Sequence, residues 1–329
     1  MFHGCGTSGI RCAHQTSLFH FPSGSKYAVA PRFSFSPGVF TITFLFVKLS
    51  AQEIRAAVKA ALAEDIGRGD ATTIATVPPG IMARAVVRAR EPLVVCGTEF
   101  VETALRELSR KVRVERILRD GQRAKAGAAL LQISGPARAI LTAERVALNF
   151  AQRLSGVATL TATSVEAVRG TGTKILDTRK TTPGWRRFEK YAVACGGGTN
   201  HRIGLFDMVL IKDNHLAALR DAKPNAIAAA ISRARKKFPN LKIEVEADTL
   251  EQVRQALDAG AEMILLDNMS LKQLRQAVKM ANGSAKTEAS GGVNLKTARA
   301  IARTGVDFIS IGALTHSARA VDIGLDFEE

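Results

Sequence analysis

The chain from residue 50 onward begins with a pattern of apolar and polar positions typical of a helix. In "SAQEIRAAVKAALAEDIGRGD", Ser50 and Glu53 have the spacing of a capping box. Ile54, Val58 and Leu62 then fall on one helical face. The pattern therefore predicts an amphipathic helix that begins just after Ser50.

Short strands and helices follow in no regular order. The segments "IMARAVVRARE" and "LVVCG" are predicted strands, and residues 98–108 form a predicted helix. The stretch "KVRVERILRDGQRAKAGAALLQISG" indicates two strands joined at Asp120 and Gly121, and a further helix is expected to begin at Thr142. The first half is thus a mixed α+β unit.

From Lys174 onward, strands and helices alternate regularly. The predicted strands are "KILDT", "MVLIK", "KIEVE", "MILLD", "AKTEAS" and "DFISIG", and the predicted helices span residues 225–238, 250–259, 271–280 and 295–303. Such alternation predicts a parallel sheet, and the number of units favours a closed or nearly closed α/β barrel. A doubly wound open sheet is the competing fold, but no GxGxxG fingerprint follows any strand.

Each of these strands ends at a residue capable of chemistry or ligand binding. In strand order, the ends are Asp177, Lys212, Glu246, Asp267, the run Glu288 to Gly292, and Gly312. Asp177 is followed directly by Thr178, Arg179 and Lys180. In an α/β barrel the carboxyl ends of the strands meet at one rim, where active sites lie. We therefore expect these side chains to surround one cavity.

Residues 1–49 differ from the rest of the chain. They contain no Asp or Glu and are rich in Ser, Gly, Phe and Pro. An organellar transit peptide shares the shortage of acids, but no amphipathic face is visible. A mis-assigned start codon, with the protein beginning near Val47 or Leu49, is the alternative, and the composition leaves both open.

The chain is strongly basic, with a formal net charge of +16 and a pI near 10.1. This charge calls for an anionic partner. Aromatic residues make up only 5% and the basic residues are spread along the chain, so small phosphate or carboxylate substrates explain the charge as well as nucleic acid does. The four cysteines form no CxxC pair, which disfavours zinc and a disulfide framework, and a reducing cytoplasm is the simplest compartment.

One segment concentrates cations beside glycines: "DTRKTTPGWRRFEKYAVACGGGTNHR". This composition predicts a site for an anion, since arginine grips carboxylates and phosphates with paired hydrogen bonds. On the same rim, Glu246 and Asp267 are expected to bind a hydrated Mg²⁺ or the hydroxyls of a sugar. "SGGV" and "IGAL" follow the last two strands, where barrels commonly hold a phosphate.

Other residues have a simpler interpretation. Arg186, Arg187 and Lys190 are expected on a solvated helix face. His215 and His316 are expected to be satisfied by backbone groups, and Cys195 lacks a recognisable base partner.

Taken together, several motifs closely resemble the quinolinate phosphoribosyltransferase family. They are "DTRKTTPG", "GGGTNHRIGLFDMVLIKDNH", "IEVEADTLEQ", "ILLDNM", "SGGVN" and "TGVDFISIGALTHSA", and "EDIGRGDATT" and "TAERVALNF" resemble its amino-terminal half. The resemblance covers about residues 50–329.

The resemblance implies an amino-terminal α/β sandwich domain plus an incomplete parallel α/β barrel. The sandwich would span residues 50–146, with residues 318–329 packing back on it, and the barrel residues 147–317. It also implies a homodimer in which each sandwich covers the partner's barrel. The implied reaction converts quinolinate and phosphoribosyl pyrophosphate into nicotinate mononucleotide, pyrophosphate and CO₂ in de novo NAD biosynthesis, with Mg²⁺ required.

The family's functional residues carry over to matching positions of this chain. Those implied around the quinolinate are Arg145 (from the partner subunit), Thr178, Arg179, His201, Arg202 and Lys212. Lys180 would lie near the quinolinate and the pyrophosphate. Glu246, preferred to Glu244 because it ends its strand, and Asp267 would hold the ribose hydroxyls and Mg²⁺. Those implied at the 5′-phosphate are Ser290, Gly291, Gly292 and Gly312.

Three alternatives stay open at this point. A sister phosphoribosyltransferase would act on another aromatic acid or serve molybdenum metabolism. A nucleic-acid-binding protein would bind DNA or RNA in a salt-sensitive way. A scaffold of this fold without activity is the third, and the intact motifs oppose it.

Overall fold

The structure is a computed structural model that describes residues 47–328. Apart from its last three positions, the predicted extension over residues 1–49 lies outside the described residues. Among residues 47–328, no helix is both long enough and apolar enough to cross a membrane.

An antiparallel sheet of four strands lies in the amino-terminal half, and its order is β12-β1-β5-β3. The bounds are Met82–Ala89 for β1, Arg113–Arg116 for β3, Ala129–Pro136 for β5 and Ile323–Glu328 for β12. Two short strands, β2 (Leu93–Val94) and β4 (Arg123–Ala124), pair with each other. Within residues 47–328, the last strand thus pairs with the first, with Ile323 opposite Ala89.

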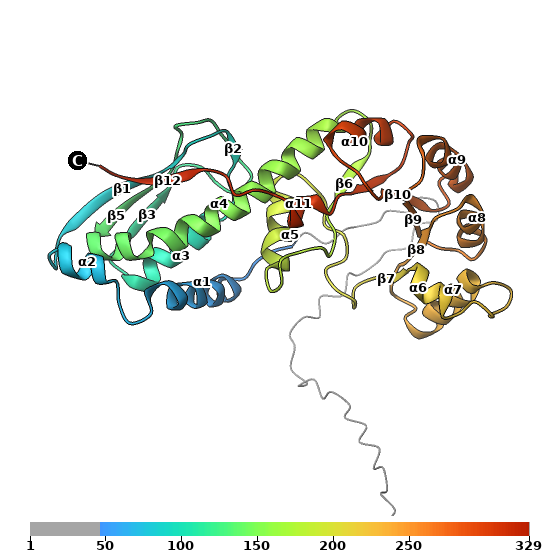
Figure 1. Cartoon of the computed structure of the whole chain (residues 1–329), viewed down its shortest axis with the longest axis horizontal. Helices are drawn as coiled ribbons and strands as arrows, with labels where there is room; N and C mark the ends of the chain where they lie inside the picture. The colour runs from blue at the N-terminus through green and yellow to red at the C-terminus, as the bar shows by residue number, and fades with distance from the viewer. Residues whose placement is uncertain (1–46, 329) are drawn as a thin grey trace, which may run out of the picture. The chain divides into compact units, whose positions relative to one another are not determined.

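Helices pack against one face of this sheet (Figure 1). They are α1 (Ala51–Ile66), α2 (Ala71–Thr76), α3 (Thr98–Leu108) and the long α4 (Ala137–Ala167). The predicted capping box of Ser50 and Glu53 is present in α1, and its predicted apolar face is buried. One face of the sheet is therefore covered by helices, which gives the predicted α/β sandwich.

Helix α4 begins five residues before the predicted start at Thr142 and continues for 31 residues. Pro136 occupies its N-cap, and proline lacks the N–H that a helix start leaves unpaired. The expected domain boundary between residues 146 and 147 falls inside this helix. Near its middle, Gly156 lets another segment cross closely, because an added Cβ would lie 2.0 Å from the carbonyl oxygen of Arg319.

The second half contains a parallel sheet of six strands in the order β6-β11-β10-β9-β8-β7. The bounds are Lys174–Leu176 for β6, Val209–Ile211 for β7, Ile243–Ala247 for β8, Met263–Asp267 for β9, Lys286–Ser290 for β10 and Phe308–Ser310 for β11. The strands β6 and β7 stand at the two ends of this order, so the barrel is open between them. The predicted incomplete barrel is confirmed, and the competing doubly wound sheet is wrong.

Helices lie between the strands as predicted (Figure 1). They are α7 (Ala226–Lys237), α8 (Leu250–Asp258), α9 (Leu271–Ala281) and α10 (Leu295–Ala302). Each begins after a polar N-cap whose side chain accepts a backbone N–H of the first turn, namely Asn225, Thr249, Ser270 and Asn294. Three shorter helices are α5 (Arg186–Cys195), α6 (Asp213–Ala217) and α11 (Ala313–His316).

Strand β8 shows how the sheet separates its two faces. Ile243, Val245 and Ala247 are fully buried and belong to the hydrophobic core shared with the helices. Glu244 and Glu246 alternate with them, so they lie on the opposite face, inside the barrel. The alternation of the sequence thus places two acids in the barrel interior.

Candidate active site

The parallel register brings the predicted strand-end residues to one edge of the sheet. Lys212 follows β7 directly, and its Nζ donates to Glu246 Oε2 on the neighbouring β8. Asp267, at the end of β9, is the register partner of Ser290, at the end of β10. Because these strands are parallel neighbours, their carboxyl ends form one rim.

The other end of the sheet closes the same rim around Lys180. Its backbone carbonyl accepts a hydrogen bond from Thr315 Oγ1 at 2.6 Å, and Thr178 Oγ1 accepts the N–H of Lys180 at 3.1 Å. A Cβ added to Gly312 would lie 3.1 Å from both Lys180 Cδ and His316 Nε2. The β6 loop that carries Lys180 and the turn after β11 are therefore in contact.

Two guanidinium groups, those of Arg179 and Arg202, lie close together here, and neither forms a direct ion pair with an acid among residues 47–328. The Nε of Arg179 is buried and has no hydrogen-bond partner among residues 47–328. Burial and the charge of Arg179 lower the pKa of Arg202. Arg202 Nη1 donates only a long bond, of 3.3 Å, to the carbonyl of Met208. An anion between the two arginines would accept a hydrogen bond from Arg179 Nε and offset the repulsion between the two charges.

The two acids of the rim have partly satisfied carboxylates. Glu246 forms an ion pair with Lys212, and Asp267 Oδ2 accepts a hydrogen bond from Asn268 Nδ2 at 2.8 Å. Both acids are partly exposed. Mg²⁺ prefers carboxylate oxygens and keeps several bound waters, so two partly exposed carboxylates fit this ion. Glu246 would then contact both Lys212 and the ion.

The turn after β10 is shaped by glycine. Gly291 and Gly292 have φ values of 94° and 61°, which side chains other than glycine rarely adopt. A Cβ on Gly291 would also lie 2.1 Å from Asn268 Oδ1. The turn thus exposes backbone rather than side chains at the rim, as a site for a phosphate requires.

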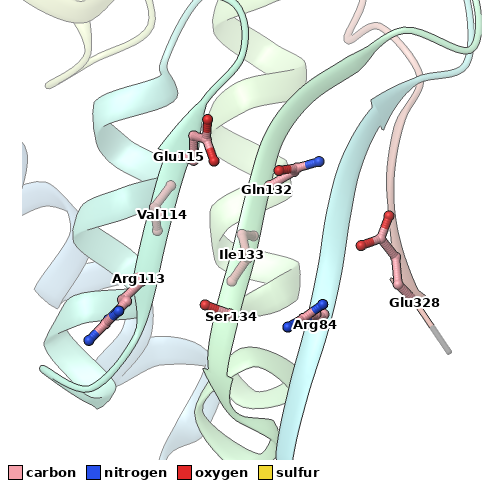
Figure 2. Close-up of a pocket in the computed structure, with 8 residues that line it drawn as sticks. All are labelled: Arg84, Arg113, Val114, Glu115, Gln132, Ile133, Ser134 and Glu328. Atoms are coloured by element: carbon pink, nitrogen blue, oxygen red, sulfur yellow. The ribbon is translucent and has the colours of Figure 1, made fainter.

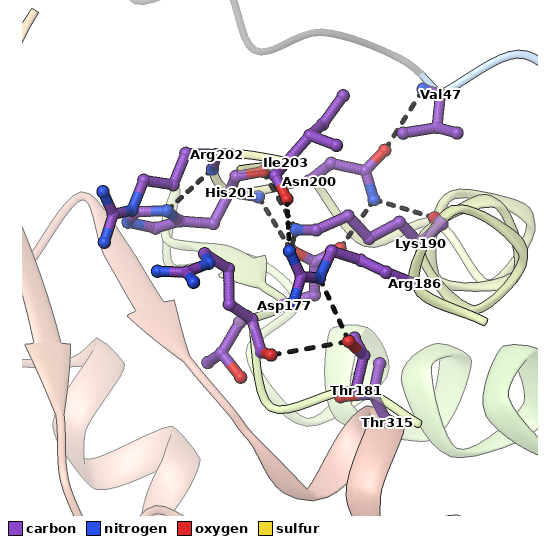
Figure 3. Close-up of polar contacts among 12 residues, drawn as sticks. Val47, Asp177, Thr181, Arg186, Lys190, Asn200, His201, Arg202, Ile203 and Thr315 are labelled. Carbon is purple, nitrogen blue, oxygen red and sulfur yellow. Dashed lines mark hydrogen bonds and ion pairs between the residues drawn. The ribbon is translucent and has the colours of Figure 1, made fainter. Parts of the chain in front are cut away.

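A buried polar network lies under the arginines (Figure 3). Asp177 is fully buried and accepts hydrogen bonds from Lys190 Nζ, from Asn200 Nδ2 at 2.7 Å and from the backbone N–H of His201 at 2.8 Å. Lys190 is also fully buried, so its predicted place on a solvated helix face is wrong. The carboxylate 13 residues away supplies the counter-charge that burial of a lysine requires.

The neighbouring cations also have protein partners. Arg186 donates to Thr181 Oγ1 at 3.2 Å and to the carbonyl of Ile203 at 3.2 Å. Arg187 forms an ion pair with Glu53 of α1. These arginines hold the loop and the helix α5 in place rather than forming a fully solvated face.

The three successive glycines, Gly196 to Gly198, serve packing. A Cβ on Gly196 would lie 2.3 Å from the carbonyl oxygen of Ala158, and one on Gly198 would lie 2.7 Å from Thr161 Cγ2. Both contacts are with helix α4. These glycines therefore allow the loop to approach α4 and do not themselves form the predicted anion site.

His201 lies between two acids, Glu244 and Glu288. Of these, Glu244 is the acid to which Glu246 was preferred from the sequence. His201 is 7% exposed, and its Nε2 lies 2.9 Å from Glu244 Oε2 and 3.4 Å from Glu288 Oε2. Burial, together with the charge of Glu288, raises the pKa of Glu244 to about 7. Burial opposes the protonated form of the His201 ring, whereas the charges of the two acids favour it. The spacing of Glu244 and Glu246, two residues apart on one strand, was the signal that both face the barrel interior.

Arg145 is not brought to this rim by its own subunit. It is exposed on α4, and none of the hydrogen bonds or ion pairs recorded for residues 47–328 connects it with the barrel residues. Close to it, Thr142 Oγ1 donates to Asp70 Oδ2 at 2.8 Å, which ties this part of α4 to the N-cap of α2.

A separate hollow lies on the open face of the antiparallel sheet (Figure 2). Its volume is about 410 Å³, and it is lined by residues of β1, β3, β5 and β12, among them Arg84, Arg113, Glu115 and Glu328. It contains none of the strand-end residues of the barrel.

Comparison with known proteins gives matches over most of the chain. Residues 70–155 match the family described as quinolinate phosphoribosyl transferase, N-terminal domain, and residues 157–326 match the corresponding C-terminal domain. A nicotinate-nucleotide pyrophosphorylase (carboxylating) from Mycobacterium leprae is 45% identical over 278 residues, which cover 83% of this chain and 96% of that protein. A chloroplastic relative of the same name from Arabidopsis thaliana is 39% identical, covering 89% of this chain and 94% of that one.

The fold agrees with solved structures as well. The nicotinate-nucleotide pyrophosphorylase from Francisella tularensis superposes with a TM-score of 0.82 at 40% identity, covering 87% of this chain and 100% of that one. That from Ehrlichia chaffeensis gives a TM-score of 0.79 at 42% identity, covering 85% and 100%.

Proposed function

This chain belongs to the quinolinate phosphoribosyltransferase family, and we propose that it transfers the phosphoribosyl group of phosphoribosyl pyrophosphate to quinolinate. CO₂ and pyrophosphate leave, and nicotinate mononucleotide is the product that enters NAD biosynthesis. The observation that carries the proposal is the pair Arg179 and Arg202, two neighbouring cations at the barrel rim, neither of which forms a direct ion pair with an acid among residues 47–328.

Quinolinate is a dicarboxylate, and the rim offers a cation for each carboxylate. Arg179 and Arg202 suit paired hydrogen bonds to carboxylate oxygens, and Lys212, on the same rim, would add a point charge. His201 precedes Arg202 in the chain, and its ring accepts a hydrogen bond from the backbone N–H of Arg202. Arg145 would complete this set from the partner subunit of a homodimer, since its own barrel does not use it.

The ribose and its leaving group would lie over the acids. As pyrophosphate departs, positive charge develops on the ribose, and Glu246 and Asp267 would stabilise that charge while they hold the hydroxyls. Mg²⁺, bound by the same two residues and largely through the substrate, would supply neutralisation of the pyrophosphate charge. Lys180 at the adjacent loop would contribute a further cation for the leaving group.

The 5′-phosphate would bind at the other side of the rim. The backbone of Gly291 and Gly292, the side chain of Ser290, and the turn at Gly312 present small polar groups there. A phosphate accepts hydrogen bonds from such backbone N–H groups without needing a basic side chain.

Decarboxylation follows from the bond formed. When the pyridine nitrogen attacks C1′, the ring becomes positively charged and can accept an electron pair. The C2 carboxylate then leaves as CO₂, and C2 keeps the electron pair of the broken bond until it takes up a proton. The cations at the rim must therefore bind this carboxylate without preventing its departure.

The direct test is an assay with quinolinate, phosphoribosyl pyrophosphate and Mg²⁺. We expect nicotinate mononucleotide and CO₂ in equal amounts, and no product when any component is omitted. Nicotinate in place of quinolinate is the control for a sister enzyme, because it lacks the second carboxylate. Absence of product together with salt-sensitive binding of DNA or RNA would instead support a nucleic-acid-binding protein.

The shared site of the homodimer has its own test. Homodimers of Arg145→Ala and of Lys212→Ala should each be inactive. Mixing the two should restore activity, because one of the two active sites of the heterodimer then contains an intact Arg145 from one subunit and an intact Lys212 from the other. No recovery in confirmed heterodimers would refute a site completed by the partner.

We also propose a cytoplasmic location for the enzyme. Cys96 and Cys195 are free thiols although they are close neighbours, as expected in a reducing compartment. A fluorescent fusion to the carboxyl end of the full chain would show diffuse cytoplasmic signal if this is correct, and an organellar pattern would refute it.

A further inference from the structure

We propose that His201 is a positioning residue for Arg202, held in place by Glu244, and that it does not contact quinolinate itself. The proposal rests on the proposed function for the identity of the substrate, but its structural basis is the hydrogen bonding of the imidazole ring. It assigns a role to Glu244, an acid inside the barrel that the reaction as described above does not use.

Both nitrogens of the His201 ring are engaged within the protein. Nδ1 accepts the backbone N–H of Arg202 at 2.7 Å, and Nε2 lies 2.9 Å from Glu244 Oε2. The ring is only 7% exposed. A neutral imidazole has one donor and one acceptor, so this ring has no nitrogen left for a substrate oxygen.

The two partners also fix where the ring proton lies. The N–H of Arg202 requires a lone pair on Nδ1, so the proton is on Nε2 and is donated to Glu244. Glu244 and Glu288 favour a second proton on the ring, but that proton would lie on Nδ1 and point at the backbone N–H of Arg202. The same conflict argues against a metal ion in the cluster of His201, Glu244 and Glu288. A metal bound at Nε2 would leave the ring proton on Nδ1, where it would again face the N–H of Arg202.

The ring thereby determines where Arg202 points. The backbone N–H of His201 is fixed by Asp177 at 2.8 Å, and that of Arg202 by the His201 ring. Anchoring is needed here because Arg179 repels Arg202. Without the anchor, the loop would relax and the two guanidinium groups would separate, which weakens their joint hold on a dicarboxylate.

Glu244 keeps the ring in this orientation. It is fully buried, and its Oε2 is the nearer of the two acid oxygens to Nε2. Glutamine at this position still offers an amide oxygen to the Nε2 proton, whereas leucine leaves it only the more distant Glu288 Oε2, at 3.4 Å. A buried donor that loses its nearer partner favours a reoriented ring.

The first experiment measures KM for both substrates in five single variants. His201→Ala should raise the KM for quinolinate by roughly 10-fold or more, the size expected for a lost buried hydrogen bond, and change the KM for phosphoribosyl pyrophosphate by less than about threefold. His201→Asn places an amide oxygen near the position of Nδ1 and should recover most of the loss. His201→Gln keeps the reach toward Glu244 but not the acceptor for Arg202, and should recover less. Glu244→Gln should be milder than Glu244→Leu. Equal losses in the Asn, Gln and Ala variants would overturn the proposal, since a cationic ligand of the substrate is lost equally in all three.

A double-mutant cycle with Arg202→Ala separates the two roles. If His201 acts through Arg202, His201→Ala should add less than about twofold in the Arg202→Ala background. If His201 binds quinolinate directly, the two effects should multiply, and this outcome would refute the proposal. Thermal unfolding of each variant identifies those that lose the fold, and the Asn and Gln variants carry the test if the alanine variant does not fold.

A measurement without substrate tests the hydrogen bonding alone. In protein labelled with ¹⁵N-histidine, the nitrogen shifts of His201, identified with the His201→Asn variant, should show a neutral ring protonated at Nε2 at pH 7. A doubly protonated ring, or a bound divalent metal at His201 in the purified enzyme, would overturn the proposal. This readout is independent of turnover, so an error in the proposed reaction would not be mistaken for a failure of the positioning role.

Discussion

Replacing Lys190 by methionine removes the cation that faces Asp177 while keeping a similar volume. Both side chains are fully buried, and burial raises the pKa of Asp177 and lowers that of Lys190. Each charge is therefore tolerated only because of the other. Removing one partner of a buried pair typically costs about 3–5 kcal/mol. Asp177 keeps the donors from Asn200 and His201, which places the expected loss near the lower end, about 3 kcal/mol.

This loss is measurable by thermal and denaturant unfolding. A loss of about 3 kcal/mol corresponds to a decrease in Tm of roughly 4–5 °C for a chain of this size. The double variant with Asp177→Asn removes the abandoned charge as well, and it should recover at least half of the lost stability. A Lys190→Met variant that loses less than about 1 kcal/mol would refute the reasoning. So would a double variant whose loss equals the sum of the two single losses.

Three further predictions concern the site, the pH dependence and the thiols. Arg179→Ala should abolish turnover and leave the thermal unfolding curve unchanged; near-normal kcat would remove Arg179 from the site. The hydrogen-bonded pair with Arg319 lowers the pKa of Glu91 from 4.5 to about 2, so its contribution to stability is complete above pH 4.5 and lost as the pH falls through 2. Glu91→Gln should therefore lose less stability than the wild type over this range, by a small amount because Arg319 is exposed and its charge is screened by water, and equal acid unfolding curves would contradict this. Full burial raises the pKa of the Cys96 thiol, so iodoacetamide at pH 8 should modify Cys195 well before Cys96, as peptide mass spectrometry would show; equal modification would refute it.

The barrel could be predicted because each of its units carries its own signals. Strand β8 alternates apolar and acidic positions, and the helix after it begins with Thr249 and Gln252, a capping box visible in the sequence. Local patterns of this kind are independent of the rest of the chain. That the barrel is incomplete followed from the family resemblance, whereas the strand order and the position of the opening are known only from the structure.

Contacts between distant residues could not be predicted in the same way. Lys190 resembles a surface lysine until Asp177 is known to face it across the loop, and Glu244 resembles Glu246 until the depth of each in the barrel is known. The start of α4 was placed at Thr142 because of a helix-start signal there, although the chain is already helical from Ala137. In each case the deciding partner lies elsewhere in the three-dimensional structure.

The pairing of β12 with β1 has a consequence for biosynthesis. Strand β1 is complete once residue 89 has been made, but its partner on one side consists of residues 323–328. During translation this edge of the amino-terminal sheet stays open to association with other nascent chains until residues 323–328 have left the ribosome. Completion of this sheet therefore waits for a segment made more than 230 residues after β1, and deleting residues 323–328 should expose an aggregation-prone edge.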